Sequence, residues 1–343
     1  MSSETRSICI LPRLEGLGGP ASFRARLING LNRRGIATHD NPLDPTCAAV
    51  LVIGGTRHVN LVWQAHRRGV RIVQRLNGMN WMHRKRFTGV RHFVRSELNN
   101  ALLAFIRGQL ADAIVYQSQF SRSWWQTRYG DARVMGTVVY NGVDLQAYSP
   151  EGAGRPPQDF IRLLVVEGHL GGGHEQELLN AVEFARLLQE NQQKPVELQV
   201  VGDVPAALRG RLSHAPVRLN FSGIVPRQQI AEMDRSAHLI FPAEITAACP
   251  NSVIEALACG LPVVSFATGS LPELVADDAG RVVPYGGNFW NLEPPDVPAL
   301  VDAAGEVLAN QPAFRRAARL RAEALFDADK MVEQYLAAMG IGD

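Results

Sequence analysis

The stretch CPNSVIEALACGLPVVSFATGSLPELV, residues 249–275, carries the densest pattern in the chain. Asn251 and Ser252 predict the start of a short helix, because Asn and Ser side chains cap helix amino ends. Gly260 predicts its end, and the apolar run that follows predicts a buried parallel strand. Free backbone N–H groups at such a helix start favour an anion, and Glu255 lies about one turn inside. The stretch therefore predicts a phosphate site at a sheet edge, with an ordinary helix-strand-helix repeat as the alternative.

The same alternation of apolar runs and amphipathic stretches extends along the chain and predicts parallel strands joined by helices. It is interrupted by a segment rich in Gly and Pro at residues 149–160, which predicts a linker. We therefore expect an α/β protein with two doubly wound domains, residues 1–152 and 153–325. In the first half, strands are expected at residues 7–12, 48–55, 69–76, 112–118 and 137–142, and helices at 20–35, 95–110 and 119–128.

Composition agrees with an ordinary globular protein, because 343 residues suffice for two domains and 46% of them are hydrophobic. No leader pattern begins the sequence and no apolar run approaches the length of a membrane span, so we expect a cytoplasmic protein. The cysteines, Cys9, Cys47, Cys249 and Cys259, are scattered without a Cys-x-x-Cys pair. They predict buried thiols and no metal site.

Charge is unevenly distributed, although the net charge is only +2. Between Asp44 and Glu97 there is no acidic residue, whereas ten Arg and Lys residues fall in that interval. Such a surface attracts phosphates or anionic lipid headgroups, unless it is a solvated face balanced by acids elsewhere in the fold. No recognition helix, RNA-binding strand pattern or zinc finger accompanies it, which argues against nucleic acid.

Several motifs in order resemble the family-4 retaining glycosyltransferases of the GT-B fold. The opening stretch is similar to their donor-binding signature, VVYNGVDLQAYSP (138–150) to their interdomain motif, and GLGGPASF (16–23) to their first glycine loop. FSGIVPRQQIAEMDRSAHLIFPA (221–243) resembles their base-binding segment, and residues 326–343 resemble the terminal helix that returns to the first domain. The resemblance covers nearly the whole chain and implies two Rossmann-like domains, a nucleotide-sugar donor linked to UDP or GDP, and no cofactor or metal.

The sequence departs from the family pattern at two places that matter for the chemistry. The family carries a glutamate eight residues before the one matched by Glu255, and that position is Ala247 here, with Glu244 three residues earlier. The family also carries an arginine and a lysine that neutralise the donor diphosphate, and their positions hold His169 and Gly173. Losing charge-assisted contacts of this kind costs about 1.5–3 kcal/mol each, unless other groups replace them. The candidate replacement for the glutamate is Glu244, and those for the basic pair are His169 or His174, the glycine-rich backbone, or an arginine of the first domain.

The resulting candidate site combines both domains. Arg75, Asn77 and His83 follow the third expected strand, and we interpret them as sugar or acceptor contacts, with loop shaping as the alternative. The expected catalytic residues are His169, Glu244, Asn77 and His83. The expected donor-binding residues are Gly18, Gly19, Arg75, Gly173, His174, Gly223, Ile224, Asn251, Ser252, Val253 and Glu255.

Transfer of a sugar to a glycan, or to a lipid-linked or other anionic acceptor, is thus the predicted activity. Peripheral contact at the inner face of the membrane, through the basic first domain, is a further expectation. The departures leave a degenerate GT-B protein that binds a saccharide or partner without transfer as the alternative, and another GT-B enzyme such as an epimerase or phosphorylase as a third. A dehydrogenase is disfavoured, because GLGGPA begins several residues after its strand ends and no residues for hydride transfer accompany it.

Overall fold

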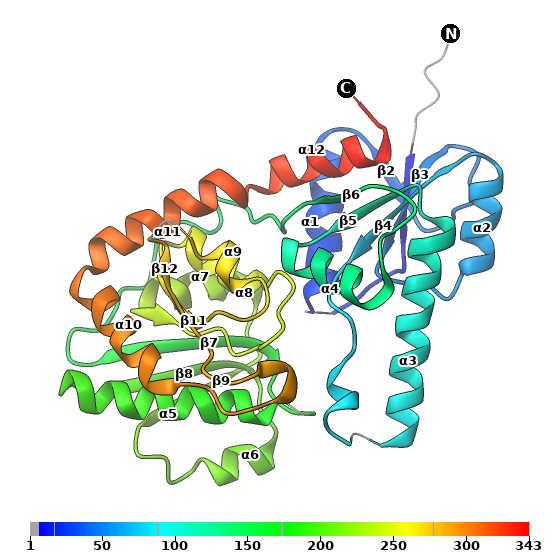
Figure 1. Ribbon diagram of the computed structural model, residues 1–343. Helices are drawn as coiled ribbons and strands as arrows, with labels where there is room; N and C mark the ends of the chain where they lie inside the picture. Colours follow the sequence, from blue (N-terminus) through cyan, green and yellow to red (C-terminus); the bar gives the residue numbers. More distant parts are fainter. Residues whose placement is uncertain (1–6, 17, 88, 173, 277, 343) are drawn as a thin grey trace. The chain divides into compact units, whose positions relative to one another are not determined.

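The computed structural model describes residues 7–16, 18–87, 89–172, 174–276 and 278–342. The chain divides into two compact units (Figure 1). Unit 1 comprises Met1–Gly142 and Asp327–Asp343, and unit 2 comprises Val143–Phe326. Each unit contains one parallel sheet with helices packed against it.

The sheet of unit 1 has six strands in the order β2-β1-β3-β4-β5-β6, and every neighbouring pair is parallel. The order reverses between β1 and β3, which makes their carboxyl ends the switch point of this sheet. The strands are β1 (Ser7–Leu11), β2 (Ala37–His39), β3 (Cys47–Ile53), β4 (Arg71–Leu76), β5 (Ala113–Tyr116) and β6 (Gly136–Val138). The helical segments are α1 (Gly19–Arg33), α2 (Val59–Arg67), η1 (Met82–Arg84), α3 (Val90–Phe105), η2 (Ile106–Leu110), α4 (Gln119–Tyr129) and α12 (Ala328–Met339).

The helix α12 belongs to the core of unit 1. Phe23, Leu27 and Leu31 share one face of α1 at four-residue spacing and are all buried. They pack in one cluster with the buried face of α12, which includes Val332. A Cβ atom at Gly30 would collide with Val332, so this glycine allows the close approach of α1 to α12.

The sheet of unit 2 has the order β12-β11-β10-β7-β8-β9, again parallel throughout. Its order reverses between β7 and β10. The strands are β7 (Ile161–His169), β8 (Val196–Asp203), β9 (Arg218–Gly223), β10 (Leu239–Ile240), β11 (Val263–Phe266) and β12 (Gly280–Val283). The helical segments are α5 (Glu175–Gln192), α6 (Ala206–Arg211), α7 (Arg227–Ser236), α8 (Asn251–Ala258), α9 (Leu271–Leu274), η3 (Phe289–Asn291), α10 (Val297–Ala309) and α11 (Gln311–Leu325).

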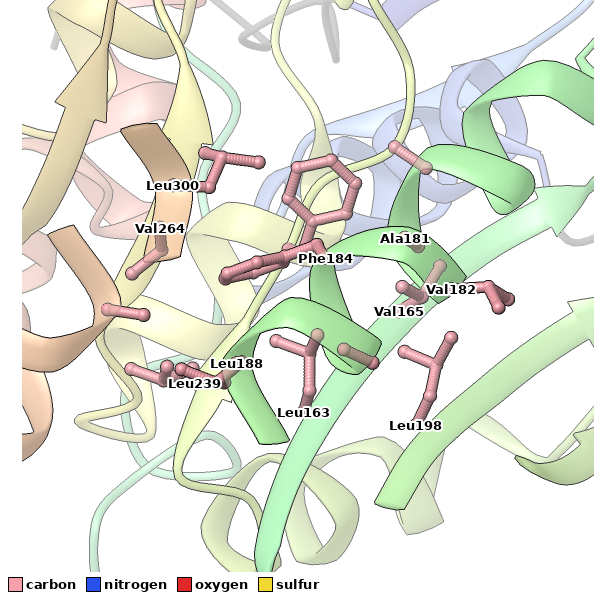
Figure 2. Close-up of a cluster of buried hydrophobic side chains, with 14 of the residues drawn as sticks. Leu163, Val165, Ala181, Val182, Phe184, Leu188, Leu198, Leu239, Val264 and Leu300 are labelled. Atoms are coloured by element: carbon pink, nitrogen blue, oxygen red, sulfur yellow. The ribbon is translucent and has the colours of Figure 1, made fainter. Parts of the chain in front are cut away.

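The core of unit 2 lies between this sheet and helices α5 and α10. Figure 2 shows Phe184 of α5 between Leu300 of α10 and the strand residues Leu163 of β7 and Leu198 of β8. The Phe184 ring meets the Phe241 ring edge-on, at 5.6 Å between centroids. This cluster packs against β7 and fixes the position of the strand. The last residues of β7 therefore have fixed positions at the carboxyl end of the sheet.

The sequence-based prediction of two doubly wound α/β sheets is confirmed. The units, however, separate at Gly142 and Val143, ten residues before the expected boundary at 152. The intervening residues are fixed to unit 2, because Arg319 donates to the Tyr148 carbonyl at 2.8 Å and Arg235 to the Ser149 carbonyl at 3.1 Å. Such long-range contacts cannot be predicted from the local composition of the sequence.

Candidate functional site

A pocket of about 230 Å³ opens at the switch point of unit 2, where the order of the strands reverses. Its walls come from the end of β7, the residues after β10 and the start of α5. In open parallel sheets, ligands bind beyond the carboxyl ends of the strands at such a point. The lining residues are Glu167, Gly168, His169, Leu170, His174, Glu177, Ala243 and Glu244.

Glu167 ties the end of β7 to the loop that follows β10. Its Oε1 accepts hydrogen bonds from the backbone N–H groups of Ala243, at 3.1 Å, and Glu244, at 3.3 Å. Gly202 allows β8 to pass beside it, since its φ is +131° and a Cβ would collide with the Glu167 carbonyl oxygen. Desolvation by burial, with a further contribution from the Glu244 carboxylate, raises the pKa of Glu167 to about 8. Glu167 therefore keeps its proton at neutral pH and adds no negative charge to the pocket.

A second set of ionisable groups surrounds the start of α5. His174 Nδ1 lies 3.5 Å from Oε1 of Glu177, whose side chain is 2% exposed. Hydrogen bonding to Glu177 raises the pKa of His174, which favours the imidazolium. Desolvation raises the pKa of Glu244, while the nearby His174 lowers it. The pocket thus places a histidine favoured as a cation near Glu167 and Glu244, whose pKa values are raised by burial.

His169 is the last residue of β7, and its partner Asp203 is the last residue of β8. The two are in register, and His169 Nδ1 donates to Asp203 Oδ2 at 2.8 Å. The carboxylate fixes the orientation of the ring and leaves Nε2 as its other functional nitrogen. Both side chains are about half exposed, so His169 is accessible to a ligand in the pocket.

The amino end of α8 differs in detail from the prediction. The helix begins at Asn251, with Pro250 in an extended conformation as its cap and no side-chain cap hydrogen bond. The expected capping role of Asn251 or Ser252 is therefore wrong, because Asn251 already has helical geometry. Val253 is fully buried and can offer a ligand only its backbone N–H. Glu255 is 7% exposed.

Ala247, where the family has a glutamate, is buried and fixed by the turn after β11. The backbone N–H of Ser270 donates to the Ala247 carbonyl at 2.9 Å. Gly269 has a φ of +58°, and a Cβ there would lie 2.7 Å from the same carbonyl oxygen. The loop after β10 is thus held at both ends, and the acidic group that it presents to the pocket is Glu244.

Sequence reasoning missed Glu167, Glu177 and Asp203, which together with the predicted residues form and orient the pocket. Glu167 directly follows the apolar run of β7, and Asp203 ends β8, so their positions just after apolar runs were the available signal. It also missed Asp234, which is fully buried on α7, beneath the helix α8 that carries Glu255. Burial and the neighbouring Glu255 raise the pKa of Asp234 well above its ordinary value.

In unit 1, Arg75 and Asn77 form an internal network. Arg75 is fully buried at the end of β4, with its guanidinium carbon 3.8 Å from the centroid of the Phe23 ring. Its Nη1 donates to Asn77 Oδ1 at 2.8 Å, and its Nη2 donates to Asn141 Oδ1 at 2.9 Å. The structure therefore gives Arg75 no exposed surface for the donor contact that the sequence suggested. It positions Asn77, which is half-buried and keeps part of its surface open to solvent.

His83 is also enclosed, in contrast to the expected acceptor contact. It is 5% exposed, its ring centroid lies 5.0 Å from that of Phe93, and its Nε2 is 2.7 Å from Glu97 Oε1. Hydrogen bonds from Arg84 and His83 lower the pKa of Glu97 to about 2. In this structure, His83 fastens the short helix η1 to α3.

The remaining predicted donor-binding residues lie at element ends. Gly18 precedes α1 and Gly19 is its first residue, both exposed after the switch-point strand β1. Gly223 ends β9 with a φ of +66°, and Ile224 beside it is 61% exposed. Gly173 lies outside the described residues.

Neither a metal-binding cluster nor a membrane-spanning helix occurs among the described residues. Within this part of the chain, no group of three or more His, Cys, Asp or Glu side chains could hold a metal ion. None of the helices in the same ranges is long and apolar enough to cross a bilayer.

Comparison with solved structures identifies the fold. The chain resembles sucrose-phosphate synthase from Thermosynechococcus elongatus, with a TM-score of 0.71 and 16% identity over 96% of this chain and 97% of that one. Alr3699/HepE from Anabaena, solved with UDP and glucose, gives a TM-score of 0.70 and 16% identity over 98% and 99%. WaaG, a glycosyltransferase involved in lipopolysaccharide biosynthesis, gives 0.69 and 16% over the same shares.

Sequence comparison points to the same group. Residues 168–310 match the family model of glycosyl transferases group 1. One subunit of phosphatidylinositol N-acetylglucosaminyltransferase from Arabidopsis thaliana is 26% identical over 183 residues, which are 52% of this chain and 40% of that relative. The chain thus spans less than half the length of this curated relative. The protein has the GT-B fold, and its residues 168–310, which include most of the pocket lining, match the family model of glycosyl transferases group 1.

Proposed function

We propose that the protein transfers a sugar from a nucleotide-sugar donor to an acceptor hydroxyl, with the donor held at the switch point of unit 2. The observation that carries this proposal is the pocket at the ends of β7 and β10, inside the segment that matches the glycosyltransferase family. The solved complex of Alr3699/HepE with UDP and glucose supports a donor of the nucleotide-sugar class.

The pocket suggests how a donor can bind although the basic pair of the family is absent. Glu167 is neutral at neutral pH, and its protonated carboxyl can donate a hydrogen bond to a donor oxygen. His174, favoured as an imidazolium by Glu177, can supply positive charge to the leaving diphosphate. The Nε2 atom of His169, oriented by Asp203, is available for a second contact. Glu244 is the acid available for the sugar hydroxyls, in place of the missing glutamate at Ala247.

The proposed mechanism is electrostatic. Groups fixed by the strand ends stabilise the negative charge that develops on the leaving diphosphate, and they need little reorganisation when it forms. In a retaining front-face reaction the leaving phosphate itself takes the proton of the acceptor hydroxyl. The roles of Glu244 and His169, retention at the anomeric carbon, and independence from metals and cofactors are parts of this proposal. So is a glycan or lipid-linked, anionic acceptor.

The acidic lining favours a second candidate, a protein that binds a saccharide without transferring it. Glu167, Glu177 and Glu244 line the pocket, and among its described lining residues there is no lysine or arginine. Carboxyl groups are common partners of sugar hydroxyls, whereas they repel a diphosphate when ionised. The two candidates therefore differ in whether a nucleoside diphosphate binds.

Calorimetric titration with UDP, GDP and their sugar conjugates tests the proposal. We expect saturable binding of one nucleotide, weakened at least tenfold in Glu255→Gln because the ribose contact implied by the family resemblance is altered. Glu190→Gln, at an exposed glutamate near the end of α5 in the same unit, is the matched control and should bind like the wild type.

Product analysis completes the test. Incubation of the binding nucleotide-sugar with glycan and lipid-linked acceptors should release the nucleoside diphosphate and form a glycoside with the anomeric configuration of the donor. Excess EDTA should leave the rate unchanged. If the folded protein binds free saccharides but no nucleotide, the saccharide-binding alternative holds and transfer is excluded.

A further inference from the structure

The outer face of α3 in unit 1 is apolar. Five side chains at spacings of four, four, three and four residues form one exposed stripe, which extends about 22 Å along the helix. Four of them are large: Val90 is 70% exposed, Val94 50%, Leu98 65% and Phe105 48%. The stripe, named here the α3 stripe, consists of Val90, Val94, Leu98, Ala101 and Phe105.

The opposite face of the same helix carries two buried polar side chains, and its last turn packs Leu102, Leu103 and Ala104 against the core of unit 1. Ser96 is 4% exposed and Asn100 is 1% exposed. Asn100 donates from Nδ2 to the Asn80 carbonyl at 2.7 Å and accepts at Oδ1 from the Asn80 N–H at 3.0 Å. A surface helix of a globular protein ordinarily turns its apolar side inward. The last turn of α3 follows this rule, but the α3 stripe faces away from the core, which indicates that an apolar partner outside the chain covers it.

Positive charge borders the stripe along one side. Arg91 and Arg95 lie next to it on the helix surface, are exposed, and have no carboxylate partner among the residues that the structure describes. The single acid of α3, Glu97, is bound by Arg84 through two hydrogen bonds of 2.6 and 2.7 Å and by His83. Phe87, just before the helix, is 88% exposed. Figure 1 shows α3 and the segment with η1 side by side, extending away from the sheet of unit 1.

We propose that the α3 stripe docks unit 1 onto a bilayer surface that contains anionic phospholipids. A helix with an apolar face and arginines at its border binds in the plane of the headgroups, where the apolar side chains enter the acyl boundary and the cations pair with phosphates. The stripe is a convex line along one helix, which suits a planar surface. A second copy of the chain would bring rows of arginine with the same charge toward each other.

Vesicle flotation tests this docking directly, and it needs no donor or acceptor sugar, so its outcome is independent of the proposed transfer. The full chain is mixed with vesicles of phosphatidylcholine alone or of phosphatidylcholine with phosphatidylglycerol. We expect binding to the anionic vesicles only, reduced by salt. The double variant Arg91→Gln/Arg95→Gln should lower the partition coefficient about thirtyfold. Val94→Gln/Leu98→Gln should lower it at least about tenfold.

The control changes the same residue types in unit 2. Arg316 and Leu320 are exposed on α11, and Arg316→Gln/Leu320→Gln should bind the anionic vesicles like the wild type. Circular dichroism confirms folding of each variant, and amide hydrogen exchange over residues 84–98 should slow when anionic vesicles are added.

Four results overturn the proposal. The first is equal binding to neutral and anionic vesicles, or to neither. The second is loss of vesicle binding in the α11 control as large as in the α3 variants. The third is a wild-type dimer, by light scattering, that becomes monomeric in Val94→Gln/Leu98→Gln, which assigns the stripe to a second copy. Preference for RNA over vesicles, lost in Arg91→Gln/Arg95→Gln, equally excludes the lipid surface.

Discussion

Replacing Glu167 by glutamine should remove a pH dependence of stability that the structure places in unit 2. The pKa of Glu167 is raised from 4.5 to about 8, chiefly because the carboxyl group is desolvated. Between these two pH values the folded protein holds a proton that the unfolded chain has released. The free energy of unfolding therefore falls as the pH rises through this window, and it levels off above about pH 8.

The magnitude follows from the same shift. A change from 4.5 to about 8 corresponds to at most about 5 kcal/mol of unfolding free energy lost across the window. Glutamine never ionises, and its Oε1 can still accept the hydrogen bonds from Ala243 and Glu244. Glu167→Gln should therefore match the wild type near pH 5 and exceed its stability near pH 9 by a few kcal/mol.

The assay is urea unfolding of the full chain, followed by circular dichroism from about pH 5 to about pH 9, for wild type and variant. The difference between the two proteins isolates Glu167 from other titrating groups, and Glu232→Gln controls for loss of an exposed glutamate. Parallel curves for wild type and Glu167→Gln over this range would refute the assignment of a protonated Glu167 to the pocket.

Three further outcomes are expected. Glu177 raises the pKa of His174, so the positive charge of His174 is present at low pH and is lost as the pH rises through that raised pKa. Calorimetric titration should therefore show that His174→Ala weakens UDP binding several-fold near pH 6 and little near pH 9. Asp203→Asn removes the carboxylate that orients His169, so steady-state kinetics should show kcat reduced about tenfold or more with a smaller change in KM. Val332→Ala should lower the unfolding free energy of unit 1 by about 2 kcal/mol, measured in urea, and leave the transition of unit 2 unchanged.

The sequence predicted those parts of the fold that depend on local periodicity. Apolar runs such as residues 48–55 identified β3, and the spacing of Phe23, Leu27 and Leu31 identified the buried face of α1. Two short elements were missed, since β2 has only three residues and α2 only nine. The expected helix at 95–110 begins earlier, at Val90, because its first turns carry their apolar residues on the outside.

Only part of the candidate site could be predicted from the sequence, namely single residues at the ends of strands. His169 and Glu244 were identified from the positions where the chain departs from the family pattern, and both line the pocket. The burial of Arg75 and His83 was not predictable, because it depends on the packing of α1 and α3 against them. The neutral state of Glu167 depends on the combined desolvation and charge of its neighbours, which single residues in a sequence do not report.

The position of α12 in the core of unit 1 has a consequence for biosynthesis. Unit 2 is a single continuous segment, whereas unit 1 is assembled from both ends of the chain. During translation unit 2 can fold as soon as its last helix leaves the ribosome, but unit 1 must wait for Val332 and its neighbours. Until then the surface of α1 around Gly30 is uncovered. A nascent or prematurely terminated chain would therefore expose this apolar surface. Molecular chaperones would then bind unit 1 in preference to unit 2.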